Sequence, residues 1–180
     1  MPNLQEQYKK KVIPGLREKF AYKNIMAVPK IEKVVVHIGV GRMRDDKQQE
    51  EVQKYLMLVT GQKSAPRAAK KAIAAFKTRK GLIIGYQVTL RGIRMYDFLS
   101  RLVDVGLPRT RDFRGLDEES FDQKGNLTIG IKEHIIFPEM MGEDYHLLFG
   151  LEVTVVTTAR TRQEGIELLR LMGFPLQKAE

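Results

Sequence analysis

The chain of 180 residues contains no cysteine. This absence excludes a disulfide framework and a cysteine-based zinc site, and it fits a reducing environment. No uninterrupted apolar run approaches the roughly 18 residues that a membrane-spanning helix needs. Residues 1–11 lack the apolar segment of a secretory signal. We therefore expect a soluble, cytoplasmic protein that has no membrane partner.

Motifs for catalysis or metal binding are also scarce. The glycines of Gly39-Val40-Gly41 resemble part of a dinucleotide-binding turn, but the third glycine is missing, so a tight turn is the better interpretation. His37, His134 and His146 are too scattered for a metal site and are expected at the surface or hydrogen-bonded. Glu133 and His134 are neighbours on an extended segment and should point to opposite faces. We predict no catalytic site, no metal and no cofactor. A basic enzyme acting on RNA or nucleotides, the alternative from another class, would depend on Glu133, His134 and His37.

The composition indicates a folded and basic protein. Apolar residues make up 43% of the chain, which is enough for a hydrophobic core, and the length fits one domain. The formal net charge is +9 and the isoelectric point is near 9.7. A balance of this sign favours a nucleic acid or another anionic surface as partner.

The excess positive charge is concentrated in residues 63–114. This stretch holds thirteen Lys and Arg residues against three Asp, a net charge of +10, whereas residues 1–62 carry +5 and residues 115–180 carry −6. Ordinary solvated faces usually mix both signs. The basic stretch therefore indicates a surface that binds a polyanion.

Apolar spacing predicts helices in four places. The first covers residues 3–20, where Pro14 should kink or end it. The second is expected to open at Asp45 as its N-cap and to close at Gly61. The expected buried positions of these two helices are Leu4, Tyr8, Val12, Leu16, Val52, Leu56 and Val59.

The third helix is expected at about residues 93–105, with Gly106 as its terminator and Pro108 preventing its continuation. The fourth starts with the capping box Thr161-Arg162-Gln163-Glu164. The expected buried positions of these helices are Tyr96, Leu99, Leu102, Val103, Ile166, Leu169 and Met172.

Alternating apolar and polar residues predict strands at 31–38, 82–91 and 127–132, and a β-branched run predicts another at 151–158. Residues 121–126 are typical of a hairpin turn. The apolar side should carry Val34, Val36, Ile38, Leu82, Ile84, Tyr86, Val88, Leu90, Leu127, Ile129 and Ile131. The polar side should carry Lys33, His37, Gln87, Thr89, Arg91, Asn126, Thr128, Lys132 and Thr154.

Residues 66–80 are ambiguous. Their alanines favour a helix by propensity, whereas Lys77-Thr78-Arg79-Lys80-Gly81 looks like an exposed loop tip that leads into a strand. Phe76 in this stretch is expected either to stack on bases or to pack in the core. Tyr86, on the following strand, is expected in the core. Arg91 and Arg94 flank Gly92 at a strand-to-helix junction suited to phosphate.

These elements predict an α+β fold of the ferredoxin or RRM-like kind, mostly antiparallel, with helices on one face of the sheet and an open polar face. We expect a single domain over residues 1–180, with helix 3–20 as an appendage, a projecting basic loop at 66–81 and a loop at 140–150. An open, partly basic sheet face is a platform suited to RNA.

Five ordered motifs carry a resemblance to a known family: VVVHIGVG at 34–41, TGQK at 60–63, VTLRG at 88–92, PRTRDFRGL at 108–116 and IKEHIIFPE at 131–139. They resemble the bacterial large-subunit ribosomal protein L5 family, and the resemblance runs from about residue 8 to residue 174. It implies a structural RNA-binding protein of the ribosome that attaches 5S rRNA in the central protuberance. It further implies contacts with other large-subunit rRNA, P-site tRNA, neighbouring large-subunit proteins and the small-subunit protein S13.

The resemblance implies three sets of site residues. The 5S rRNA set comprises Asn24, Met26, Lys30, Lys33, His37, Lys63, Arg67, Gln87, Thr89 and Arg91. The loop that would reach tRNA comprises Phe76, Lys77, Thr78, Arg79, Lys80 and Gly81. The intersubunit-bridge set comprises Arg109, Arg111, Asp112, Phe113, Arg114, Gly115 and Tyr145.

The chain departs from the family pattern at three places. His37 stands where the family carries Asn, Ala75 replaces a Gly before Phe76, and the segment 140–146 differs from the usual acidic-tyrosine pattern. A regulatory RNA-binding module that works outside the ribosome is the alternative function.

Overall fold

A five-stranded antiparallel sheet organises the protein. The computed structural model describes residues 4–43, 45–140 and 147–177. The sheet has the order β2-β3-β1-β5-β4. Its strands are β1 (Ile31–Gly39), β2 (Ala65–Ala68), β3 (Ile83–Leu90), β4 (Leu127–Ile131) and β5 (Leu151–Thr157). Without β4, the connectivity and order are those of the split β-α-β ferredoxin-like fold. The predicted α+β class is confirmed.

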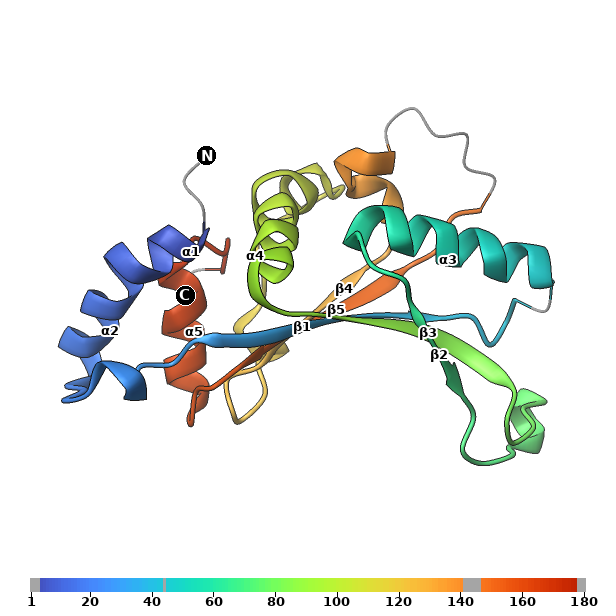
Figure 1. Cartoon of the computed structure of the whole chain (residues 1–180), viewed down its shortest axis with the longest axis horizontal. Helices are drawn as coiled ribbons and strands as arrows, with labels where there is room; N and C mark the ends of the chain where they lie inside the picture. The colour runs from blue at the N-terminus through green and yellow to red at the C-terminus, as the bar shows by residue number, and fades with distance from the viewer. Residues whose placement is uncertain (1–3, 44, 141–146, 178–180) are drawn as a thin grey trace.

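Helices cover one face of this sheet. Helices α3 (Asp46–Thr60) and α4 (Gly92–Arg101) lie above the sheet in Figure 1 and cover the core on that side. Helix α5 (Arg162–Leu171) packs at one end of the sheet against the N-terminal helical segment. In the described part of the chain, no helix lies across the central part of the opposite face (Figure 1). That face is called the open face below.

The N-terminal helix does not end at Pro14. It runs through α1 (Leu4–Gln7), a π-helical turn η1 (Tyr8–Val12) and α2 (Ile13–Phe20). Pro14 occupies the first turn of α2, where its missing N–H is tolerated, and the π turn before it absorbs the mismatch. The segment also packs on α5, with Lys19 Nζ 2.7 Å from Glu167 Oε2. The expectation that the helix ends at Pro14 was wrong, because the segment stays helical through Phe20.

Strand alternation predicted the core well near the sheet centre and failed at its tip. Val34, Val36, Val88 and Leu90 are at most 1% exposed. Leu82 and Ile84 were expected to be buried with them, yet they are 48% and 37% exposed. The reason is tertiary: the β2–β3 hairpin projects beyond the helices that cover the rest of this face (Figure 1).

Helix α4 continues further than expected. It passes into a π turn η4 (Leu102–Gly106) and a 3-10 turn η5 (Leu107–Arg109). Gly106 was expected to terminate it, but its φ of −65° is right-handed helical, and its buried Cα faces Ile136. Gly106 therefore continues the helix instead of ending it. Tyr96 is only half-buried, and Met95 and Phe98 supply the buried face instead.

The ambiguous segment 66–80 is a hairpin arm and loop, so the helical alternative is wrong. After β2, the chain forms a 3-10 turn η3 (Ala74–Phe76) closed by two backbone hydrogen bonds between Ile73 and Thr78. The base of the loop is fixed by the bond from Gly81 N to Ala69 O at 3.0 Å. Pairing with β3 overrides the helical propensity of the alanines.

The turn at residues 121–126 and the start of α5 both have the local structure that their sequences predicted. Asp122 N donates to Asn126 O at 2.9 Å, and Phe121 bridges Leu127, which confirms a hairpin turn into β4. Thr161 caps α5 by accepting a bond from Glu164 N at 3.3 Å, as the capping box predicted. The remaining short 3-10 turns are η2 (Ile25–Ala27), η6 (Glu118–Ser120), η7 (His134–Ile136) and η8 (Pro138–Met140).

His134 was expected at the surface or hydrogen-bonded, and its side chain is in fact fully buried. Its imidazole ring lies parallel to the Phe149 ring, with 4.0 Å between ring centroids, and 5.4 Å from the ring of Tyr55 on α3. Burial lowers the pKa of the imidazole below its usual 6.5. His134 is therefore part of the core beneath α3.

Candidate nucleic-acid interface

The strand register brings polar side chains from separate strands into rows on the open face. His37 on β1 lies opposite Gln87 on β3 and opposite Glu152 on β5. The next row joins Thr89, Val35 and Thr154. The predicted polar side of the sheet is therefore one continuous surface, which the sequence alone could only list strand by strand.

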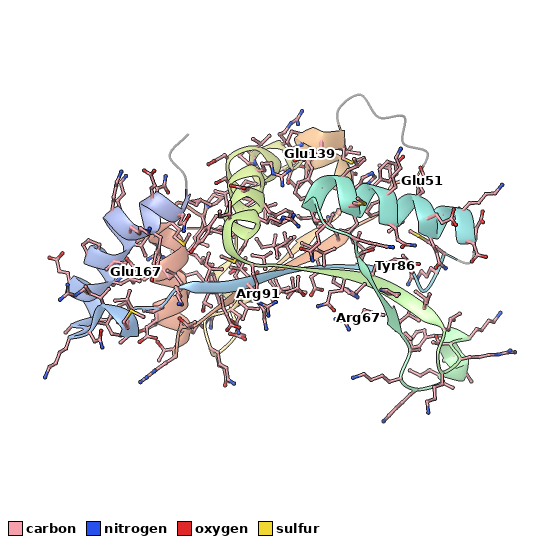
Figure 2. All side chains as sticks on the ribbon, viewed as in Figure 1. Glu51, Arg67, Tyr86, Arg91, Glu139 and Glu167 are labelled. Carbon is pink, nitrogen blue, oxygen red and sulfur yellow. The ribbon has the colours of Figure 1, made fainter. Side chains whose placement is uncertain are left out.

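Arginines border this surface near the projecting hairpin and near α4. Arg67 on β2 donates a hydrogen bond from Nε to Gln87 Oε1 at 2.7 Å. Arg91 is the N-cap residue of α4 and is exposed. Figure 2 labels both on the open side of the sheet, away from Glu51 and Glu139 on the helix-covered side. The exposed Lys63 precedes β2 and adds a third cation.

The segment that leads into β1 lies at the Lys33 end of the same surface. The Asn24 side chain has a structural role, since its Oδ1 accepts a bond from Met26 N at 2.9 Å and caps η2. Met26 is 84% exposed. Lys30 is tied to Thr158 through its backbone N–H and carbonyl, and its exposed side chain can point outward. Met26 and Lys30 are thus exposed close to the start of β1.

Two polar residues of this surface were missed by the sequence interpretation. Gln62 donates from Nε2 to Thr89 O at 3.3 Å and borders the row of Thr89. Glu152 is exposed in the row of His37. Conversely, Asn126 was expected on the polar face, yet its side chain is used internally: Oδ1 accepts from Thr157 N at 2.9 Å, and Nδ2 donates to Asp122.

A hollow of about 530 Å³ opens on the open face at the far end of β1. The residues that line it are His37, Gly39, Gly130, Ile131, Lys132, Gly150, Leu151 and Glu152. Three of these are glycines from three neighbouring strands or strand starts. The period-two spacing of His37 and Gly39, and of Gly150 and Glu152, was visible in the sequence. Only the register brings them together.

The basic loop, defined as residues 66–81, projects from the sheet (Figure 1). Phe76 at its tip is 75% exposed, so it does not pack in the core. Lys77 has a left-handed φ of 51°, and Thr78 Oγ1 donates to Phe76 O at 3.3 Å. Lys77, Arg79, Lys80 and Gly81 are all exposed. An exposed aromatic ring beside several cations is an arrangement that suits stacking on, or cation contact with, a nucleic acid.

The predicted bridge residues form a turn after η5. Arg109, Arg111, Asp112 and Arg114 are exposed, and Phe113 is half-buried. A hollow of about 510 Å³ lies between this turn and the end of β4, with Lys132 and Glu133 on its other side. Tyr145, the last predicted bridge residue, lies outside the described residues.

Gly115 has a structural role in this turn. Its φ is +106°, and a Cβ atom there would lie 3.0 Å from Gln177 Cγ. The neighbouring Leu116 pairs with the C-terminal segment, donating from N to Pro175 O at 2.7 Å and accepting from Gln177 N at 2.9 Å. The turn is thus anchored to the end of the described chain.

One member of the basic stretch, the partly buried Arg101, has a structural role. Arg101 forms an ion pair with Glu139 of η8 and donates from Nη2 to Val59 O at 3.2 Å. Burial lowers its pKa from the usual value. This side chain joins α3, α4 and η8, so it does not contribute to an RNA surface.

The rival catalytic arrangement does not form. His37 lies on the open face, whereas His134 is buried on the other side of the sheet against Tyr55. Glu133 is exposed at the bridge turn. No group of three or more metal-ligating side chains exists among the described residues. Within the same residues, no helix is long and apolar enough to cross a membrane.

Two family models match the chain. The one described as ribosomal protein L5 covers residues 24–79, and the one described as the C-terminus of the ribosomal L5 family covers residues 83–176. Both matched regions contribute strands to the single sheet, since β1 and β2 lie in the first and β3, β4 and β5 in the second.

Curated relatives match over nearly the whole chain. The chain is 51% identical to large ribosomal subunit protein uL5 of Halothermothrix orenii over 179 residues, which cover 99% of this chain and all of that protein. It is 50% identical to the uL5 protein of Desulforamulus reducens, covering 99% of both chains. For the uL5 protein of Syntrophomonas wolfei, the identity is 51% over 98% of this chain and all of the relative.

Proposed function

Because the chain belongs to the ribosomal protein L5 family and is a structural, non-enzymatic protein of the large ribosomal subunit, we propose that its open face binds 5S rRNA. The observation that carries this proposal is the alignment of Lys33, Thr89 and Arg91 on a sheet face left uncovered by the helices. The cations attract phosphates, and the hydroxyl and amide groups between them can bind 2′-hydroxyls or base edges.

The test is a filter-binding measurement of 5S rRNA at fixed salt. The double variant Thr89→Ala, Arg91→Ala removes a hydroxyl and a cation from the face, and we expect at least about a tenfold loss of affinity. Lys47→Ala on α3, an exposed cation on the helix-covered side, is the matched control and should bind nearly as wild type. Unchanged affinity of a folded double variant would contradict this placement of the site.

The basic loop is proposed to contact P-site tRNA. Its support is the projection away from the sheet together with the exposed Phe76 and three exposed cations, Lys77, Arg79 and Lys80. Changing these three cations to Ala should leave 5S rRNA binding nearly intact but reduce the protection of P-site tRNA in reconstituted ribosomes. Loss of 5S rRNA binding in this variant would contradict the assignment of the loop to tRNA.

The turn with Arg109, Arg111, Asp112, Phe113 and Arg114 is proposed to face small-subunit protein S13. Both charge signs occur around its hollow, from Arg111 and Lys132 to Asp112 and Glu133, which suits a protein surface better than a purely anionic one. Arg111→Glu should weaken subunit association at low salt. Unchanged subunit association in this variant would contradict the proposal that the turn belongs to the bridge.

A regulatory role outside the ribosome is the second candidate. The two candidates differ in how stably the protein stays bound to the large subunit. A transient module should dissociate from large subunits at high salt, whereas a structural constituent should co-sediment with them. The matches to large-subunit proteins over the full length favour the constituent.

A further inference from the structure

The glycines at the hollow of the open face are not explained by the fold itself. Gly39 and Gly130 lie inside or at the end of strands, where glycine weakens a sheet. Neither has a left-handed φ, and a Cβ atom added to either would meet no heavy atom within 4 Å. Neither backbone conformation nor packing therefore demands a glycine at these two positions. A glycine in a strand can also mark a site where a ligand approaches the backbone closely, and the space next to these two residues is open.

The walls of the hollow carry a small set of polar groups. The His37 side chain leans toward β3, since its Nε2 lies 2.8 Å from where a Cβ of Gly85 would be. Glu152 lies next to His37 on β5, and Lys132 follows the end of β4. In the described structure, Lys132 and Glu152 form no ion pair with each other.

The charge of this hollow differs from that of the remaining open face. One ammonium and one carboxylate cancel. A phosphate would meet the Glu152 carboxylate without a surplus of cations, so the hollow suits a neutral group of the RNA. Phosphates instead suit Arg67 and Arg91, which lie elsewhere on the face.

We propose that the hollow over Gly39 and Gly130 receives an unstacked base of the bound RNA, and that Glu152 and Lys132 select guanine. The inference rests on the proposed binding of 5S rRNA to the open face. Guanine presents two adjacent donors, N1–H and N2–H, beside the acceptor O6. The Glu152 carboxylate accepts from the two donors, and the Lys132 ammonium donates to O6. Unpaired bases read in this way are the usual basis of sequence-specific RNA recognition.

The test fills the hollow without disturbing the fold. Gly39→Leu places a side chain in open space on the RNA side, and Gly130→Leu does so from β4 as an independent variant. Gln48→Leu adds the same side chain to α3 on the opposite side of the sheet and is the matched control. In filter binding to 5S rRNA, we expect about a tenfold or larger loss for Gly39→Leu, a smaller loss for Gly39→Ala and none for Gln48→Leu. Thermal melting should confirm that all the variants fold.

Base identity is tested by footprinting 5S rRNA with kethoxal, which modifies the N1 and N2 positions of guanine, and in parallel with dimethyl sulfate for adenine and cytosine. The wild-type protein should protect at least one guanine that becomes reactive with Gly39→Leu and with Glu152→Gln. Equal affinity of the wild type and the folded Leu variants would overturn the base pocket while leaving the proposed function intact. A changed footprint at adenine or cytosine alone would overturn the selection of guanine. No binding of 5S rRNA by the wild type would overturn both proposals.

Discussion

Arg67 Nε donates a hydrogen bond to Gln87 Oε1 at 2.7 Å, across the pair of strands β2 and β3. The bond holds a cation of the projecting hairpin over the open face, where Arg67 pairs with Gly85 in the strand register. The two parts of the basic stretch, hairpin and sheet face, are thereby joined by one side-chain contact.

Because Gln87 holds Arg67 in place, two variants can separate the effect of the Arg67 charge on RNA binding from the effect of its position. Arg67→Ala removes a phosphate-binding cation, so it should lower the slope of log K against log salt by about 0.7 to 0.9 for 5S rRNA. Gln87→Leu keeps the cation but releases it, so it should weaken binding a few-fold with an unchanged slope. Filter binding at several salt concentrations measures both quantities. Equal slopes for Arg67→Ala and wild type would mean that Arg67 makes no phosphate contact.

Arg101 and Arg94 offer a contrast between a structural and a surface arginine. Arg101→Ala breaks the ion pair with Glu139 and the bond to Val59 O, so we expect it to lower the free energy of unfolding by about 1 to 3 kcal/mol. Arg94 is exposed, and Arg94→Ala should change stability by less than about 0.5 kcal/mol. Urea denaturation followed by circular dichroism measures both. Equal stabilities of Arg101→Ala and wild type would show that the contacts of Arg101 with Glu139 and Val59 do not stabilise the fold.

The buried His134 predicts a pH dependence of stability. Because burial lowers its folded-state pKa below the unfolded value of about 6.5, the unfolded state binds more protons between the two values. Stability contributed by the neutral ring is therefore complete above about pH 6.5 and falls as the pH decreases below it. His134→Phe keeps a ring against Phe149 and should remove this dependence. Urea midpoints at about pH 7.5 and about pH 5.5, on either side of the unfolded pKa, compare the two proteins, and the same decrease in both would assign the effect to other groups.

Glycines in this chain should differ sharply in their tolerance of alanine. A Cβ on Gly165 in α5 would overlap Gly125 O, in the turn before β4, so α5 or the turn would have to move. Gly165→Ala should therefore destabilise by about 3 kcal/mol or more, although Ala is the better helix former. Gly39→Ala meets open space and should be nearly neutral for stability. Thermal melts of the pair measure the difference, and similar melting temperatures would contradict the close approach.

The family match and the sites implied by it came from contiguous motifs, and contiguous patterns also predicted most elements. Alternation located β1 and the central part of β3 because side chains of a strand point to opposite faces whatever lies beside them. Thr161 and Glu164 located the start of α5 because a cap is a contact between near neighbours in the chain. In contrast, the exposure of Leu82 and Ile84 could not be predicted, because it depends on where the helix-covered part of the sheet ends.

The sequence by itself determined that the chain is basic, that its charge is concentrated in residues 63–114, and which residues of each strand share a face. Those properties follow from composition and from the local geometry of the backbone. Only the tertiary structure decided that Arg101 joins α4 to α3 and η8, that His134 is buried under α3, and that Gly39, Gly130 and Glu152 meet at one hollow. The physical reason is that strand register and helix packing join residues far apart in the chain, and no local pattern specifies which strand is the neighbour.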